Sequence, residues 1–170
     1  MPRRLRCLVI GESPGAPGSL CFYDPIPSGT DPVRVRRLLL QALTEDRVVF
    51  SPSLESFKEA GFVFDHVIRE QLDMEEVEIE RDRAANFESE LAASATHLLP
   101  LIERAESVWA MGMMARNAMA CLNPSIPKKR QPLTPPYRLN DKIFTSRYFT
   151  RFTSQETATR LVNQITAFIP

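Results

Sequence analysis

The feature that most constrains the fold is a short apolar run near the N-terminus that stops abruptly in a loop rich in glycine and proline. Residues 5–10 are largely apolar, which is typical of a strand buried on both faces of a parallel sheet. Gly11 ends the run, and proline breakers then recur from Pro14 to Pro27. Because ligands of open α/β sheets bind just outside the carboxyl ends of the strands, this loop predicts one wall of a ligand site.

Strand patterns alternate with helix patterns along the rest of the chain. We expect strands at 5–10, 62–64, 107–112 and 142–146, and helices at 33–43, 53–60, 86–105, 113–122 and 154–168. Asp31, Ser53 and Ser154 are the expected N-caps. Residues 123–139 are rich in proline and basic residues and are expected to form a loop. This alternation predicts a single domain over residues 1–170, a three-layer α/β/α fold with a four-stranded parallel sheet.

The charges are balanced overall but unevenly distributed. The chain has 21 Lys and Arg residues and 21 Asp and Glu residues, so net charge argues neither for nor against a nucleic-acid partner. Residues 65–90 hold ten acids and three arginines, a net charge of −7, whereas residues 125–151 hold seven bases and one acid, a net charge of +6. The basic end is either a patch for a polyanion or simply a solvated surface, and the sequence leaves both readings open.

Cysteine usage and hydropathy limit the class of protein further. The three cysteines include no Cys-x-x-Cys pair, which argues against a disulfide framework and a cysteine-rich metal site. Cys7 lies in the first apolar run and is expected to be a buried thiol. No N-terminal signal sequence and no apolar segment long enough to span a membrane is evident. We therefore expect a soluble cytoplasmic protein with no metal and no cofactor.

Polar residues follow several of the predicted strands, at the edge where ligands of such sheets bind. Topology should bring together four segments there: Glu12 with Ser13, Asp65 with His66, Gly112, and Arg147 with Tyr148. Each has a structural alternative, since the first loop can be a turn, Asp65 a helix cap and His66 a packed histidine. His97 lies on the apolar side of a predicted helix and is interpreted as structural.

Several common motifs are absent. The loop after the first strand lacks the Gly-Lys-Ser/Thr element of a phosphate-binding loop. It is also no dinucleotide fingerprint, because Pro14 and Pro17 remove backbone donors and no helix begins at once. There is no Gly-x-Ser-x-Gly sequence for a nucleophilic serine.

Residues 11–15, which read Gly-Glu-Ser-Pro-Gly, resemble the first motif of the uracil-DNA glycosylase superfamily. The Gly-Glu-x-Pro-Gly form is typical of the thermostable iron–sulfur branch and of related bacterial proteins. The chain departs from the family pattern in three ways. Ser13 stands where several branches have Asp or Asn, Tyr148-Phe149-Thr150 stands in place of the last His-Pro-Ser motif, and the four cluster cysteines are missing.

The resemblance implies a DNA-repair hydrolase that acts as a monomer and cleaves the N-glycosidic bond of uracil, and secondly of other deaminated bases, to leave an abasic site. Asp65 or Glu12 would activate water, and Tyr148 or Arg147 would replace the missing histidine that donates to the leaving base. The base would be bound by Gly11, Ser13, Pro14, Gly15, His66 and the aromatic Phe22 or Tyr23, and DNA phosphates by Arg147, Arg151, Lys128, Lys129 and Arg130.

Two alternatives remain open at this point. The first alternative is a non-catalytic, nucleic-acid-binding relative of the superfamily. The second is an enzyme of the same fold that acts on free nucleotides or nucleosides.

Overall fold

The computed structural model describes residues 4–26, 28–72, 75–76, 78–79, 88–122, 137–139, 142–146 and 154–167. Its centre is one mixed sheet with the strand order β2-β1-β3-β5-β4. The strands are β1 (Cys7–Gly11), β2 (Phe62–His66), β3 (Ser107–Ala110), β4 (Tyr137–Leu139) and β5 (Lys142–Ser146). The pairs β1–β2, β1–β3 and β3–β5 are parallel, and β4 is antiparallel to β5. The α/β class is confirmed, but the sheet has five strands rather than the four expected.

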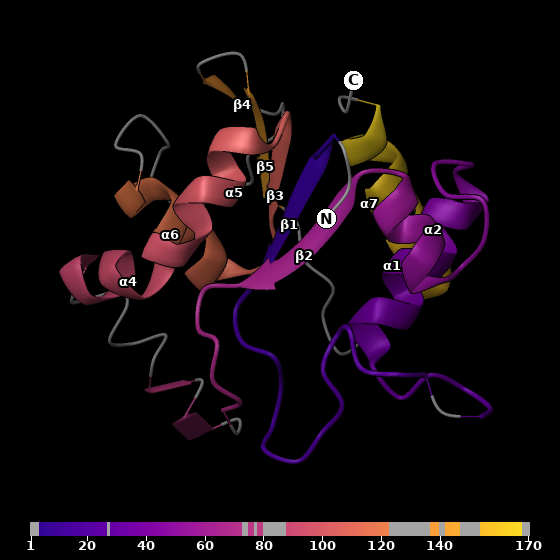
Figure 1. Ribbon diagram of the computed structural model, residues 1–170, viewed down its shortest axis with the longest axis horizontal. Helices are drawn as coiled ribbons and strands as arrows, with labels where there is room; N and C mark the ends of the chain where they lie inside the picture. The colour runs from indigo at the N-terminus through magenta and orange to yellow at the C-terminus, as the bar shows by residue number, and fades with distance from the viewer. Residues whose placement is uncertain are drawn as a thin grey trace.

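Helices cover both faces of the sheet (Figure 1). On one face lie α4 (Glu88–Ala95), η1 (Thr96–Leu98), α5 (Leu99–Arg104) and α6 (Met113–Leu122), and on the other α1 (Arg34–Glu45), α2 (Leu54–Glu59) and α7 (Gln155–Thr166). The loop between β1 and α1 leaves the carboxyl edge of the sheet and extends below it in Figure 1. The described elements thus form three layers, with the first motif at one edge of the middle layer.

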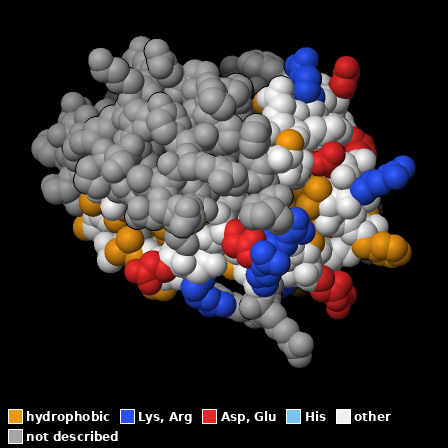
Figure 2. All heavy atoms as spheres, turned by 90° about the horizontal axis from the view of Figure 1, so that it is seen from above, with side chains coloured by type: hydrophobic (Ala, Val, Ile, Leu, Met, Phe, Trp, Pro, Cys, Tyr) orange, Lys and Arg blue, Asp and Glu red, His pale blue; other side chains and the backbone are white. Residues whose placement is uncertain are grey.

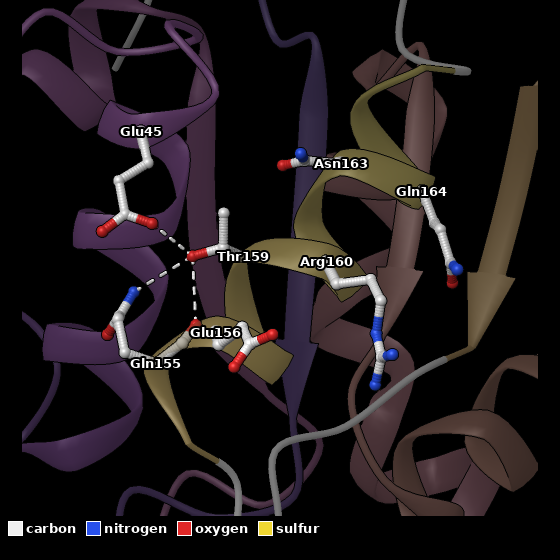
Figure 3. A pocket seen from close by; sticks show the side chains of 7 residues that line it. All are labelled: Glu45, Gln155, Glu156, Thr159, Arg160, Asn163 and Gln164. Carbon is white, nitrogen blue, oxygen red and sulfur yellow. Dashed lines mark hydrogen bonds between the residues drawn. The ribbon is translucent and has the colours of Figure 1, made fainter.

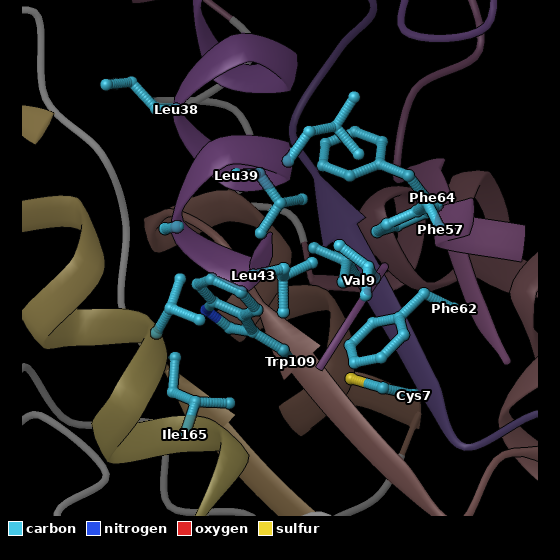
Figure 4. Close-up of a cluster of buried hydrophobic side chains, with 14 of the residues drawn as sticks. Cys7, Val9, Leu38, Leu39, Leu43, Phe57, Phe62, Phe64, Trp109 and Ile165 are labelled. Atoms are coloured by element: carbon cyan, nitrogen blue, oxygen red, sulfur yellow. The ribbon is translucent and has the colours of Figure 1, made fainter. Parts of the chain in front are cut away.

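The core consists of two apolar clusters, one on each side of the sheet. Leu8 and Ile10 of β1 belong to the cluster beneath α6, whereas Cys7 and Val9 belong to the cluster beneath α1 and α7 (Figure 4). All five residues of β1 are buried, because helices cover both faces of this central strand. Trp109 belongs to the cluster beneath α1 and α7 and is only 1% exposed. Cys7 is in the same cluster, and burial raises the pKa of its thiol to about 12.

Three local expectations about helices and strands need correction. The helix expected at 86–105 is broken at Thr96, because Pro100 has no N–H to donate to the carbonyl of Thr96. Asp31 does not cap α1, which begins at Arg34 after Val33. Strand β4 lies within 123–139, where only a loop was expected.

Two predicted caps are confirmed. The hydroxyl of Ser53 accepts a hydrogen bond from the backbone N–H of Ser56, 3.1 Å away, and that of Ser154 accepts one from Thr157 N at 3.2 Å. Each hydroxyl satisfies an N–H in the first turn of its helix, α2 and α7 respectively.

The surface seen from above in Figure 2 shows acidic and basic side chains close to one another on its described part, with hydrophobic side chains scattered among them. Among the described residues, no helix combines the length and the apolar character needed to cross a bilayer.

Candidate functional site

The ends of β1 and β2 lie side by side, so the structure brings the first motif next to the Asp65–His66 pair. Gly11 is in register with His66. The backbone pairing continues beyond the strands: Val67 N donates to Gly11 O and Ile68 N donates to Glu12 O, both at a distance of 3.0 Å. The loop that begins at Gly11 is therefore anchored along its first residues to the segment that follows β2.

A glutamine that the sequence reading missed holds the far side of this loop. Gln71 Nε2 donates to Ser19 O at 2.8 Å and to the thiol of Cys21 at 3.2 Å, and its Oε1 accepts from Gly18 N at 3.2 Å. Gly15 and Gly18 have φ values of +108° and +77°, a region that glycine enters without a Cβ penalty. The hydrogen bonds of Gln71 and the turns at Gly15 and Gly18 thus define the conformation of the loop.

Glu12 points toward the N-terminus of α6. Its Oε1 accepts a hydrogen bond from the backbone N–H of Met114 at 3.1 Å. A Cβ atom on Gly112 would lie 2.5 Å from the same oxygen, so the missing side chain at 112 is what makes room for the carboxylate. A carboxylate in this position satisfies a first-turn N–H and interacts favourably with the helix dipole.

His66 lies on the face of the sheet edge opposite to Glu12 and α6, where its ring packs against Gly11 and Phe64. Its ring meets the Phe64 ring edge-on, with 5.0 Å between centroids. Burial is the largest cause that lowers the pKa of His66 to about 4. Nearby Asp65 raises this pKa and nearby His97 lowers it, both by smaller amounts. At neutral pH the imidazole is therefore uncharged and offers one N–H donor and one acceptor nitrogen.

Asp65 faces the other way. It is in register with Ile10, whose side chain belongs to the cluster beneath α6, whereas Phe64 belongs to the cluster beneath α1 and α7. Asp65 Oδ1 accepts from His66 N at 2.8 Å and lies 3.9 Å from Nε2 of His97. The side chain is 24% exposed, so solvent reaches the carboxylate.

The two aromatic candidates differ in accessibility. Phe22 is only 3% exposed, and its ring is stacked on that of Phe64 with centroids 4.1 Å apart and planes 4° apart. Tyr23 is 39% exposed, and Lys58 Nζ lies 4.9 Å from the centre of its ring. The Tyr23 hydroxyl accepts a hydrogen bond from Phe64 N at 2.7 Å, on the free edge of β2. Burial of this hydroxyl raises the pKa of Tyr23 to about 12. Tyr23 is thus the more accessible of the two rings.

A buried arginine fixes the turn that carries these two rings. Arg36 is fully buried and forms a two-pronged ion pair with Asp31, with both N–O distances at 2.6 Å. Its Nη1 donates to the carbonyls of Cys21, Phe22 and Asp24 at 3.2, 2.8 and 2.7 Å. The sequence predicts a helix cap at Asp31 and gives no signal for the role of Arg36, since a charge on an amphipathic helix normally indicates the solvated face.

Six predicted site residues lie outside the described part of the chain: Lys128, Lys129, Arg130, Arg147, Tyr148 and Arg151. The structure therefore neither places these six residues near the motif nor separates them from it.

A surface depression between α1 and α7 is a different feature (Figure 3). It is lined by polar side chains of these two helices, among them Glu45, Thr159 and Arg160. Thr159 Oγ1 forms hydrogen bonds with Glu45 and with Gln155 O. No residue of the strand ends contributes to it. Within the described residues, no three His, Cys, Asp or Glu side chains gather as a candidate metal site.

No family model matches this chain, and no curated protein matches it either. The fold and the geometry of the sheet edge are accordingly the structural basis for a functional proposal.

Proposed function

We propose that the protein is a DNA glycosylase that hydrolyses the N-glycosidic bond of uracil in DNA, within a fold of the uracil-DNA glycosylase type. The observation that carries the proposal is the junction of β1 and β2. There the Gly-Glu-Ser-Pro-Gly loop meets a solvent-accessible carboxylate, Asp65, and an uncharged imidazole, His66.

The chemistry assigns different roles to the two side chains. Water adds to the sugar carbon as the bond to the base breaks, and the base leaves with the bonding electron pair. Asp65 orients the water and accepts its proton, because a carboxylate is a suitable general base. His66 lies on the opposite face of β2 and contacts the loop at Gly11, so it supports the loop, and the backbone N–H groups of the loop bind the edge of the base, where negative charge develops as the bond breaks.

The aromatic and backbone groups of the loop bind the base itself. Tyr23 provides the more exposed ring for stacking, and its position is fixed through its bond to Phe64. Ser13 and Gly15 contribute backbone N–H groups, whereas Pro14 has none. A base taken out of the duplex requires contacts of both kinds, to its face and to its edge.

One observation favours a second candidate, a DNA-binding relative without glycosylase activity. The Glu12 carboxylate, one of the two candidate bases, is engaged with the N-terminus of α6. Of the two candidate bases, only Asp65 then remains for catalysis.

Release of uracil from a labelled oligonucleotide tests the proposal. The wild-type protein should release uracil, and Asp65→Asn should reduce the rate by about 100-fold or more, the usual contribution of a general base. Glu59→Gln is the matched control, since Glu59 is an exposed carboxylate on α2, and it should leave the rate unchanged. Folding of each variant is checked by its thermal unfolding.

The same samples distinguish the alternatives. Salt-sensitive DNA binding without release of uracil, hypoxanthine or xanthine points to the non-catalytic relative. Cleavage of free nucleosides without DNA binding points to a small-molecule enzyme. Either result with folded protein overturns the glycosylase proposal.

A further inference from the structure

His97 of η1 connects the end of β2 to the helices on the α6 side of the sheet. Its Nδ1 lies 2.9 Å from the carbonyl oxygen of Ser94, and its Nε2 lies 2.9 Å from the carbonyl oxygen of His66. The same Nε2 is 3.9 Å from Oδ1 of Asp65. The His97 side chain is 18% exposed, so it is largely enclosed by these groups.

The two partners of the ring define its protonation. A backbone carbonyl only accepts hydrogen bonds, and a neutral imidazole carries a single N–H. Both contacts can be hydrogen bonds only when each ring nitrogen carries a proton, which is the imidazolium form. The carboxylate of Asp65 then provides the compensating negative charge.

The neighbouring titratable groups agree with this assignment. His66 is uncharged at neutral pH because burial lowers its pKa to about 4, and the nearby His97 contributes to that lowering. The Asp65 carboxylate lies 3.9 Å from Nε2 of His97, while the His66 ring faces Gly11 on the other side of the sheet.

We propose that His97 is the positioning residue of Asp65: as an imidazolium it holds the His66 carbonyl and the Asp65 carboxylate, and so fixes the direction in which that carboxylate faces. The role of Asp65 in activating water rests on the proposed function. The protonation of His97 and its pairing with Asp65 do not, and they are measured without any substrate.

Nitrogen NMR of the histidine rings provides this substrate-free measurement. The chain has two histidines, so the variant His66→Gln assigns both sets of signals. At pH 7 we expect protonated signals from both ring nitrogens of His97 and the neutral pattern from His66. Replacing the charge by Asp65→Asn should move His97 toward the neutral pattern. A neutral His97 in the wild type, or a ring that is unchanged in Asp65→Asn, overturns the proposal.

Kinetics of uracil release tests the positioning itself. His97→Gln retains donors but removes the charge, and we expect its kcat to fall about tenfold with KM for the oligonucleotide nearly unchanged. His97→Arg restores a cation with several donors and should recover part of the loss. Equal kcat values for the two variants, or a loss confined to KM, contradicts the positioning role. If the wild type releases no uracil, the proposed function fails, while the NMR result still decides whether His97 and Asp65 are paired.

Discussion

His66 lies directly on Gly11: a Cβ atom on Gly11 would be 2.9 Å from His66 Cδ2 and 3.0 Å from Phe64 Cζ. The first residue of the motif is therefore a glycine because the neighbouring strand places an imidazole there. This contact links the loop after β1 to the end of β2.

Gly11→Ala should displace the His66 ring and destabilise the protein by about 1–3 kcal/mol, as expected for overpacking at a tight contact. Urea unfolding measures the loss, and NMR of the His66 ring reports the displacement. Gly29→Ala is a useful control, because it has open space around it but a φ of +100°, and so it measures backbone strain without overlap. Wild-type stability and unchanged His66 signals in Gly11→Ala would show that the contact is looser than described.

Acid should destabilise the protein through His66. Its pKa is about 4 in the folded protein against an ordinary 6.5, so the unfolded chain binds more protons between these two values. The free energy of unfolding should be at its full value above about pH 6.5 and should fall as the pH drops toward about 4. The loss is at most about 3.5 kcal/mol, at about 1.4 kcal/mol for each unit of difference in pKa. Urea titrations across this range should show a weaker pH dependence for His66→Gln, and identical slopes for variant and wild type contradict the prediction.

Glu12 should behave as a helix-capping group. Glu12→Ala removes the acceptor of Met114 N and should cost about 1 kcal/mol, whereas Glu12→Gln retains an acceptor and should lose only the charge–dipole part, about 0.5 kcal/mol. Thermal and urea unfolding measure both values. Uracil release by Glu12→Gln should match the wild type, because Asp65 is the proposed base. A folded Glu12→Gln protein that releases no uracil would transfer the role of base to Glu12.

Arg36 should be among the most sensitive positions in the described chain. Arg36→Met leaves Asp31 buried without its partner and three carbonyls without their donor, so we expect a loss of about 3–5 kcal/mol. Arg37→Met is the control on the same helix turn, since Arg37 makes a single described bond, to Asp31 O, and should cost about 1 kcal/mol. Similar losses in both variants, measured by urea unfolding, would mean that the buried ion pair contributes little.

The same ion pair has a predictable acid limit. Burial acts to raise the pKa of Asp31, but hydrogen bonds from Arg36 and Val33 N outweigh it and keep the pKa below its ordinary value of 3.8. The contribution of this carboxylate is therefore complete above about pH 4 and is lost only as the pH falls through the lower folded value. It is thus separated from the His66 effect, which occurs at higher pH.

The sequence predicted the elements better than the contacts among them. Runs such as 5–10 and 107–112, and caps such as Ser53, follow from periodicity and local hydrogen bonding, which are short-range properties. Pro100 also indicates the break at Thr96, because a proline inside a helix pattern removes a backbone donor. The short strand β4 cannot be predicted in this way, because its pairing with β5 depends on a neighbouring strand rather than on its own residues.

The α/β alternation, the burial of β1 and the position of the Gly-Glu-Ser-Pro-Gly loop at a carboxyl strand end follow from the amino-acid sequence. The contacts of each side chain at that edge follow from the tertiary structure. Glu12 became a partner of α6, Asp65 and His66 faced opposite sides of one strand, and Phe22 was covered by Phe64. The physical reason is that hydrogen-bond partners, burial and pKa values depend on residues distant in the chain, and no local pattern encodes which of them arrive.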